Sequence, residues 1–461
     1  MIVLKFGGTS VGTSRNLLTV KHIVESQQEP AVVVVSALGG LTDKLIATAR
    51  LAAAADAAYQ TEHSAIAERH YNIIREVISA ERQPDTLAKI EPLLQELRRL
   101  YDGVSLIADL PERTLCQIVS LGERMSSVIV ADMIRGASFH NSLDFIKTEK
   151  WFDRDIASAQ LCDRLIREEF TPDTQWPAVC GGFISTDSHS GEITNLGRGG
   201  SVFTAAMIAA ALDAESLQIW TDVDGFLTTD PRIVPEAKVI PEMSFVESMD
   251  LCTFGAKVIY PPTIYPVFHK NIPIRILNTF HPEAPGTLIK DGNTLCGGAE
   301  RSHVAGISAL RDVCLATLRG TFPQQEPRLI HTRAVNALAR RGISILLVAR
   351  STEPNAFSFA IAGKDAPSAL RMLKEEFAPE LFDGTVEVIE STTGLATIAV
   401  VGDGIAKIPD ISATLLAIFA SKGIEVKALS DRASQTALSF VISEEVVAQA
   451  VTALHARLFT D

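Results

Sequence analysis

Short apolar runs alternate with longer segments of helical spacing over the first 295 residues. This alternation is typical of a mostly parallel sheet with helices on both faces. The runs that fit buried strands are 2–6, 31–36, 178–184, 216–220 and 274–277, and the helical segments include 14–26, 115–135 and 203–212. Residues 52–107 are rich in Ala, Glu, Leu and Arg, so they are predicted to be a helical excursion from the sheet.

A repeat follows the turn-rich segment 296–300. LARRGIS at 338–344 corresponds to FASKGIE at 419–425, and Ser358-Phe359 corresponds to Ser439-Phe440, each pair with an offset of 81 residues. Two copies of one unit are predicted. Each copy reads as strand, helix, strand, strand and helix, which is the order of a small split βαβ sheet. The unit resembles the ACT domain, a regulatory module that binds amino acids where copies pair, although a paired module that only dimerises the chain has the same pattern.

The composition favours a soluble protein of two or three domains. The chain has 461 residues, 47% of them hydrophobic, and a net charge of −13. An acidic surface repels phosphate polymers, so nucleic acid is excluded as a partner. The amino terminus lacks the pattern of a secretory signal and no apolar run is long enough for a membrane span, so we expect a cytoplasmic protein. The six cysteines are widely spaced, which indicates reduced thiols rather than a disulfide framework or a zinc site.

The strand that ends in Lys5-Phe6 opens into Gly7-Gly8-Thr9-Ser10, which supplies the parts of a phosphate site. Glycines let backbone N–H groups approach phosphate oxygens, and Thr9 and Ser10 are expected to cap the following helix, whose positive end favours an anion. The Lys5 ammonium adds a compact positive charge. A Walker loop is absent. Taken alone, a strand followed by two glycines is equally typical of a plain tight turn.

A second glycine-rich segment, GRGGS at 197–201, precedes the predicted helix at 203–212. The guanidinium of Arg198 at a helix start can hold a carboxylate or a phosphate through two hydrogen bonds. The alternative is a structural loop around a surface arginine. Two glycine-rich helix entries in one α/β sheet indicate phosphate and carboxylate handling more strongly than either does alone.

A third motif, TDVDG at 221–225, follows the strand at 216–220 and precedes TTDPR at 228–232. Ligands of open α/β sheets bind outside the carboxyl ends of the strands, where Asp222 and Asp224 are placed. Carboxylates there can orient a nucleotide or its metal-bound water, and Arg232 can offset phosphate charge. The pattern also occurs in simple turns, whereas the remaining ligands of a calcium loop are missing.

The ordered motifs resemble those of the aspartokinases of the amino acid kinase family. The set comprises KFGGTS at 5–10, the segment 36–42, LGERMSS at 121–127, GRGGS, TDVDG, TTDPR and FGAKVIYP at 254–261. The resemblance covers nearly the whole chain. It implies a three-layer α/β/α kinase domain with a mostly parallel sheet at 1–295, followed by two ferredoxin-like ACT domains of α+β type at 303–387 and 388–461. This layout is similar to the kinase-plus-regulatory portion of bifunctional aspartokinase/homoserine dehydrogenases.

The resemblance implies transfer of the γ-phosphoryl group of ATP to the side-chain carboxylate of L-aspartate. The product would be 4-phospho-L-aspartate, in the first step of lysine, threonine and methionine biosynthesis. Mg²⁺ would be held mainly through the ATP phosphates, so no protein metal ligand is assigned. A carboxylate is already a nucleophile, so catalysis would rest on positioning and charge neutralisation.

The resemblance also implies roles for individual residues. Lys5 and Asp222 would be catalytic, and the ATP site would comprise Lys5, Gly7, Gly8, Thr221, Asp222, Arg232 and Lys257. Aspartate would be bound by Thr42, Glu123, Arg198 and Ser201. In this arrangement Arg198 clamps the α-carboxylate, Glu123 takes the α-ammonium and Thr42 adds a hydroxyl group, so each charge of the substrate meets its opposite.

The sequence departs from the family pattern at several positions. The family usually has Asp-Tyr after GRGGS, where this chain has Val202-Phe203, and a tyrosine where this chain has Leu227. Members that sense lysine or threonine commonly carry Gln where this chain has Arg350 and Asp431. We therefore hypothesise weakened rather than abolished kinase activity, with lysine or threonine as candidate allosteric effectors.

Two other functions compete with this interpretation. One is a kinase of the same family that acts on another small carboxylate. The other is a catalytically weakened amino acid sensor, which Val202 and Leu227 favour. The chain ends at Asp461 before any dinucleotide domain, so we expect no hydride chemistry, and both a single-function protein and a fragment of a fusion are compatible with the sequence. Homo-oligomers through the ACT-like units are expected.

Overall fold

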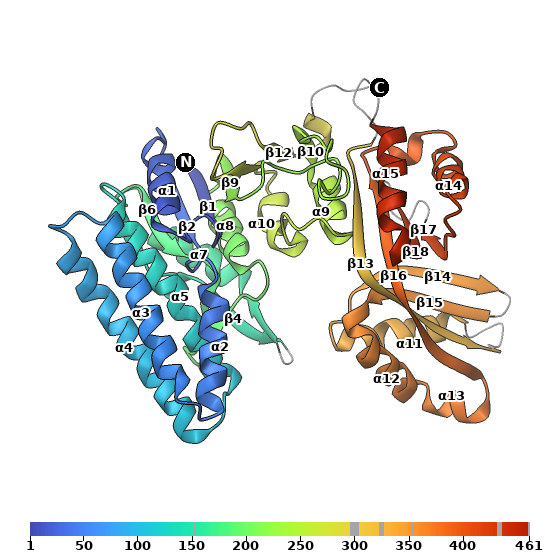
Figure 1. Cartoon of the computed structure of the whole chain (residues 1–461), viewed down its shortest axis with the longest axis horizontal. Helices are drawn as coiled ribbons and strands as arrows, with labels where there is room; N and C mark the ends of the chain where they lie inside the picture. Colours follow the sequence, from blue (N-terminus) through green and yellow to red (C-terminus); the bar gives the residue numbers. More distant parts are fainter. Residues whose placement is uncertain (152–153, 296–303, 322–326, 353–354, 431–435, 460–461) are drawn as a thin grey trace. The chain divides into compact units, whose positions relative to one another are not determined.

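The computed structural model describes residues 1–151, 154–295, 304–321, 327–352, 355–430 and 436–459. Two compact units emerge (Figure 1). The first comprises Met1–Phe226 and Ile259–Asp291, and the second comprises Leu227–Val258 and Gly292–Asp461. The turn-rich segment 296–300 and Asp431 lie outside the described residues. Within the described part of the chain, no helix has both the length and the apolar character that crossing a bilayer requires.

A mostly parallel sheet forms the centre of the first unit and confirms the predicted fold class. Its strands in this unit lie in the order β12-β11-β9-β1-β2-β6-β3, and β12 is antiparallel to β11 while the other pairs are parallel. The strands are β1 (Ile2–Phe6), β2 (Ala31–Val35), β3 (Ser138–His140), β6 (Ala178–Gly181), β9 (Ser216–Thr221), β11 (Ile274–Asn278) and β12 (Thr287–Lys290). All five residues of β2 are buried, as expected for a strand covered on both faces.

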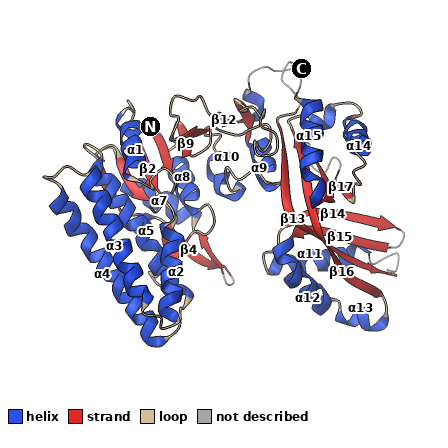
Figure 2. Ribbon diagram, in the orientation of Figure 1, coloured by secondary structure: helices blue, strands red, loops and turns tan. Residues whose placement is uncertain are grey.

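Helices cover both faces of this sheet (Figure 2). Ile2, Leu4 and Phe6 alternate along β1 and join one apolar core with residues of α1 (Ser14–Glu25) and α5 (Glu112–Met133). The opposite face contacts α8 (Gly200–Ala211), which packs against α7 (Ala159–Glu169) and the short α10 (Tyr265–Phe268). Lys5 therefore lies on the face of the sheet that α8 covers.

The predicted helical excursion at 52–107 is confirmed. It consists of the end of α2 (Leu41–Ala53), then α3 (Ala58–Val77) and α4 (Gln83–Ile107). These helices stack on one another and on α5, the leftmost group in Figure 1. Their apolar faces extend the core that begins at β1.

The prediction of one strand at 178–184 is wrong. β6 ends at Gly181, and β7 (Ile184–Asp187) belongs to a second, four-stranded sheet of order β5-β4-β7-β8. The other members are β4 (Lys147–Trp151), β5 (Arg154–Ala157) and β8 (Ile193–Asn195), and the short α6 (Ser142–Phe145) precedes β4. The break occurs because Phe183 adopts a φ of 70°, which no strand residue can have.

The second unit is built on an antiparallel sheet of order β14-β15-β13-β16-β18-β17. Its strands are β13 (Gly306–Gly320), β14 (Ile345–Thr352), β15 (Asn355–Ala362), β16 (Val386–Val401), β17 (Ala428–Ser430) and β18 (Ala437–Ser443). The helices are α11 (Pro327–Arg340), α12 (Ala366–Glu376), α13 (Ala378–Asp383), α14 (Ile411–Ser421) and α15 (Val447–Leu458). In both copies of the repeat, strand, helix, strand, strand and helix follow one another in the predicted order.

The two long strands β13 and β16 serve both halves of this sheet. Cys314 of β13 packs in one core with Ile389 of β16, whereas Ile307 of β13 packs in the other core with Val400 of β16. Each half therefore takes part of its core from the strand that begins the other half. The limits 303–387 and 388–461 stay a prediction.

The segment 227–258 lies between the two sequence parts of the first unit and packs onto the second half of the antiparallel sheet. It carries β10 (Glu242–Ser244) and α9 (Phe245–Thr253). The N–H of Ile307 donates to the carbonyl of Thr228 at 2.7 Å, and the N–H of Asp403 donates to Oε1 of Glu247 at 2.7 Å. Val234 joins the apolar core of that half. This segment therefore belongs structurally to the second unit.

Candidate active site

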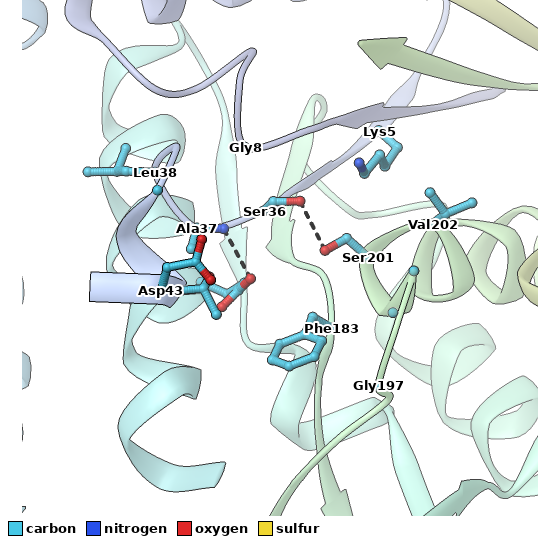
Figure 3. A pocket seen from close by; sticks show the side chains of 15 residues that line it. Lys5, Gly8, Ser36, Ala37, Leu38, Asp43, Phe183, Gly197, Ser201 and Val202 are labelled. Carbon is cyan, nitrogen blue, oxygen red and sulfur yellow. Dashed lines mark hydrogen bonds between the residues drawn. The ribbon is translucent and has the colours of Figure 1, made fainter. Parts of the chain in front are cut away.

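A cavity of about 380 Å³ opens at the carboxyl ends of β1, β2 and β6, inside the first unit. This is the edge at which open α/β sheets bind ligands. Figure 3 shows Lys5, Ser36 and Ser201 around the same opening. The lining residues are Lys5, Gly8, Ser36, Ala37, Leu38, Gly40, Thr42, Asp43, Glu123, Phe183, Gly197, Gly199, Gly200, Ser201 and Val202.

The loop after β1 presents backbone rather than side chains to Lys5. A Cβ atom added to Gly7 would lie 3.4 Å from Nζ of Lys5, and one added to Gly8 would lie 3.4 Å from the carbonyl oxygen of Ala37. The N–H of Gly7 donates to the carbonyl of Trp220 at 3.2 Å, which ties the loop to the neighbouring strand β9. A positive charge beside side-chain-free backbone is suited to phosphate oxygens.

The predicted capping by Thr9 and Ser10 is wrong. Helix α1 is capped by Thr13, whose Oγ1 accepts a hydrogen bond from the N–H of Asn16 at 3.3 Å. Ser10 is buried instead, and its hydroxyl group contacts Oγ1 of Thr279 at 2.7 Å. The helix begins at Ser14, as predicted, and three residues separate it from Ser10, so Thr9 and Ser10 are too far away to cap it.

Glu123 brings a buried carboxylate into the cavity from α5. Its Oε1 accepts a hydrogen bond from the N–H of Ala37 at 3.1 Å, while its Oε2 is buried and has no hydrogen-bond partner among the described residues. An unpaired buried carboxylate oxygen is unfavourable by about 1–3 kcal/mol or more. The free oxygen is therefore suited to a ligand that brings a hydrogen-bond donor, above all a cationic one.

Burial shifts the pKa values of the two charged groups in the cavity. It raises the pKa of Glu123 to about 7, against the hydrogen bond from Ala37 and the attraction of Lys5. It lowers the pKa of Lys5 to about 8, against the attraction of Glu123. Desolvation is the larger effect on both groups, so their mutual attraction does not compensate for burial. A ligand with both an anionic and a cationic group would stabilise both charges.

The start of α8 closes the other side of the cavity. Gly199 adopts a φ of 74° before the first turn, and its Cα lies so close to Thr263 that an added Cβ would be 2.9 Å from Cγ2 of that residue. The Oγ of Ser36 donates to Oγ of Ser201 at 3.0 Å (Figure 3). Val202 also lines the cavity and is 8% exposed. The helix directs its positive end and one hydroxyl group towards Lys5 and Glu123.

Not every residue predicted for the acceptor site lies in the cavity wall. Thr42, Glu123 and Ser201 line it. Arg198 does not, because its exposed guanidinium stacks over the ring of Tyr260 at 5.5 Å from the centroid. Arginine–aromatic stacking of this kind is weak at an exposed position.

The residues predicted for the nucleotide site are spread more widely. Lys5 and Gly8 line the cavity, and Gly7 lies beside them. Thr221 ends β9, the strand next to β1, and Asp222 follows it; Oγ1 of Thr221 donates to Oδ1 of Asp222 at 3.2 Å. Asp224 accepts a hydrogen bond from Nδ2 of Asn278 at 2.7 Å, so it is engaged in the protein.

Arg232 and Lys257 belong to the segment 227–258 of the second unit. The guanidinium of Arg232 donates hydrogen bonds to both carboxylate oxygens of Asp230, the shortest at 2.7 Å, so its charge is already paired. Lys257 is exposed. The sequence analysis did not predict that Asp230 and Arg232, which both belong to the motif TTDPR, form an ion pair with each other.

Sequence reasoning missed two residues of the wall, Asp43 and Phe183. Asp43 follows the predicted Thr42 in the first turn of α2, and an acidic residue there is ordinary in any helix. Phe183 follows the pair Gly181-Gly182, which was a usable signal. A Cβ at Gly182 would lie 2.6 Å from Cα of Ser201, so the glycine pair lets Phe183 and α8 approach each other.

Comparisons with known proteins agree with this geometry. Residues 1–278 match the model of the amino acid kinase family, and residues 398–458 match a model of the ACT domain. A bifunctional aspartokinase/homoserine dehydrogenase of Haemophilus influenzae is 32% identical over 472 residues, covering 100% of this chain and 57% of the relative. Aspartokinase 1 of Arabidopsis thaliana, a chloroplastic protein, is 29% identical, covering 99% of this chain and 80% of that protein. The chain spans about half the length of the bifunctional relatives it matches.

The fold also matches solved structures over its full length. Escherichia coli aspartokinase III in complex with aspartate and ADP, in the R-state, has a TM-score of 0.83 and 27% identity, with 100% of both chains covered. The same enzyme in complex with lysine and aspartate, in the T-state, has a TM-score of 0.75. The family match extends over more than half of the residues and includes every lining residue of the cavity. The chain therefore belongs to the amino acid kinase family, and part of its carboxyl-terminal region matches the ACT domain.

Proposed function

We propose that this protein is an aspartate kinase, which transfers the γ-phosphoryl group of ATP to the side-chain carboxylate of L-aspartate and forms 4-phospho-L-aspartate. The single observation that carries the proposal is the unpaired Oε2 of buried Glu123, in a cavity that Lys5 shares. An amino acid with an α-ammonium group supplies the missing donor. The full-length likeness to an aspartokinase with aspartate and ADP supports this acceptor and this nucleotide.

The acceptor would lie between α5 and the start of α8. Glu123 would receive the α-ammonium group, and Ser201 and Thr42 would offer hydroxyl groups to the substrate. Arg198 would bind the α-carboxylate only after its guanidinium leaves the ring of Tyr260. This change is favourable, because a bidentate ion pair with the carboxylate is stronger than the stacking contact that is lost. The side-chain carboxylate would then face Lys5.

The nucleotide would lie along the glycine loop and the end of β9. Lys5 would neutralise charge on the group in transfer, and the backbone at Gly7 and Gly8 would approach the phosphates. Asp222 would orient the nucleotide side of the reaction. Mg²⁺ would be held mainly through the ATP phosphates; no cluster of three or more metal-ligating side chains occurs among the described residues. Bound Mg²⁺ would supply further charge neutralisation.

The test is formation of an acyl phosphate, trapped as a hydroxamate with hydroxylamine, from ATP, Mg²⁺ and L-aspartate. We expect product only when aspartate and ATP are both present, and much less with L-glutamate, which is one methylene longer. Glu123→Gln should raise the KM for aspartate, whereas Glu112→Gln, exposed in the first turn of the same helix, should not. A protein that turns over glutamate faster than aspartate would contradict the assignment.

A catalytically weakened sensor of the same fold is the second candidate, because Val202 places an apolar group in the wall where the family usually has aspartate. The variant Val202→Asp is expected to increase aspartate turnover if the apolar side chain limits the rate. Wild-type protein that binds aspartate by calorimetry without turnover, together with no gain in Val202→Asp, would favour the sensor.

We further propose feedback control by lysine or threonine and assembly into homo-oligomers through the ACT-type units. The support is the lysine complex of E. coli aspartokinase III and the ACT match at 398–458. Calorimetric titration with each amino acid, followed by sedimentation with and without it, tests both proposals. If neither amino acid binds, the proposal of feedback control fails and only the assembly role of the second unit remains.

A further inference from the structure

Helix α3, which the sequence motifs leave without a function, sends one cationic side chain to the two loops of the cavity. Nη2 of Arg69 donates a hydrogen bond to the carbonyl of Gly12 at 2.9 Å and another to the carbonyl of Gly39 at 2.7 Å. The two acceptors lie 57 and 30 residues away in sequence. One nitrogen thus joins the loop after β1 to the loop after β2.

These two loops meet through backbone alone. A Cβ on Gly39 would lie 2.8 Å from the carbonyl oxygen of Gly8 and 3.2 Å from Cα of Gly12. A Cβ on Gly12 would in turn lie 3.3 Å from the carbonyl oxygen of Gly8. Side chains therefore do not set the separation of the loops at this point. The separation of the loops is set by contact between the glycine backbones and by the guanidinium of Arg69, which donates hydrogen bonds to both carbonyl groups.

Each loop contributes to the cavity. Gly8 lines it from the first loop, and Ala37, Leu38 and Gly40 line it from the second. The N–H of Ala37 also holds Oε1 of Glu123. A shift of the second loop relative to the first would therefore move the Glu123 carboxylate relative to Lys5.

We propose that Arg69 is a positioning residue, which fixes the distance between the nucleotide-side loop 7–12 and the acceptor-side loop 36–40. The inference rests on the proposed kinase function for its catalytic consequence. Arg69 does not line the cavity, but charge-assisted hydrogen bonds to two carbonyl groups are strong enough to select one arrangement of the loops. Phosphoryl transfer between two bound substrates is sensitive to such spacing.

The rest of α3 does not depend on this contact. Ile66, Ile73 and Ile74 anchor the helix in the main core of the first unit. Removal of the Arg69 side chain should therefore loosen the loops without releasing the helix. Arg75 provides a control on the same helix, because its side chain donates hydrogen bonds to Glu68 and Asn72 and not to the loops of the cavity.

The experiment compares Arg69→Ala, Arg69→Lys and Arg75→Met with the wild type in steady-state turnover. Arg69→Ala is expected to lower kcat by about 10- to 100-fold with smaller changes in both KM values, since a displacement near 1 Å has effects of that order. Arg75→Met should keep the wild-type kcat, with or without millimolar guanidinium chloride, whereas guanidinium should restore part of the activity of Arg69→Ala. Equal kcat in Arg69→Ala and the wild type, or loss in Arg69→Ala without rescue, would overturn the proposal.

A second readout does not depend on activity. Amide hydrogen exchange should accelerate in loops 7–12 and 36–40 of Arg69→Ala, while the amides of α3 after His70 keep their wild-type rates. If Arg69→Ala loses protection throughout the first unit, Arg69→Lys takes its place in both measurements. Wild-type exchange rates in both loops refute the positioning role. A wild type without kinase activity but with the expected exchange pattern would refute the proposed function alone.

Discussion

Replacement of Glu123 by glutamine tests this buried carboxylate in two ways. It should change how the free energy of unfolding depends on pH, and it should weaken the binding of an amino acid. The carboxylate is 4% exposed, and its Oε2 has no hydrogen-bond partner among the described residues. Burial raises its pKa from the ordinary value of 4.5 to about 7. Glu123→Gln keeps the shape and an oxygen for the N–H of Ala37, and it removes the ionisable group.

The magnitude follows from the linkage between protonation and folding. A pKa displaced from 4.5 to about 7 corresponds to about 3 kcal/mol. Between these pH values the unfolded chain has released the Glu123 proton while the folded chain keeps it. This group therefore makes the free energy of unfolding fall as the pH rises through the window, and its contribution is constant above the folded pKa. Glu123→Gln lacks this contribution.

The assay is denaturant unfolding of both proteins at several pH values from 4 to 8.5. We expect the stability of Glu123→Gln relative to the wild type to increase by about 3 kcal/mol between the lower and upper ends of this range. Saturating aspartate at pH 8 should stabilise the wild type and leave the variant nearly unchanged, because an ammonium group pairs with the carboxylate only. A constant stability difference across the pH range would refute the buried, unpaired state of Glu123.

Two further substitutions probe the same cavity. Lys5→Met should lower kcat by about 10²- to 10³-fold, the usual effect of removing one electrostatic contact to the transition state; an unchanged kcat in the hydroxamate assay would exclude the catalytic role of Lys5. Gly39→Ala should reduce turnover strongly, because its Cβ would lie 2.8 Å from the carbonyl oxygen of Gly8. The control Gly103→Ala, in open space on α4, should instead add about 0.5–1 kcal/mol to the free energy of unfolding. Equal turnover in both alanine variants would contradict the close loop contact.

Much of the fold follows from local sequence patterns. The limits of β1 were predicted to the residue, since a short apolar run that ends at Gly7-Gly8 has the length and the flanking glycines of a buried strand. The helical composition of 52–107 was likewise sufficient, because propensity summed over many residues outweighs individual exceptions. The failure at 178–184 came from a residue with positive φ, and Phe183 is a residue type that gives no warning of that conformation.

The sequence predicted which residues lie in the candidate site better than it predicted the contacts that their side chains make. Motif order placed Lys5, Thr42, Glu123 and Ser201 in one site, and the structure brings these four side chains to one cavity. The motifs did not show the stacking of Arg198 on Tyr260 or the pairing of Arg232 with Asp230. Hydrogen-bonding and charged side chains have several suitable partners in a sequence, and only packing selects one of them.

By itself, the sequence determined the alternation of strands and helices, the duplicated carboxyl-terminal unit and most of the residues that line the cavity. The tertiary structure decided that Oε2 of Glu123 is unpaired, that Arg69 bridges two glycine loops, and that β13 and β16 each serve two cores. The division has a physical reason. Backbone preference and apolar periodicity act between neighbours in the chain, whereas desolvation, backbone contact and hydrogen-bond pairing depend on which distant segments the completed fold brings together.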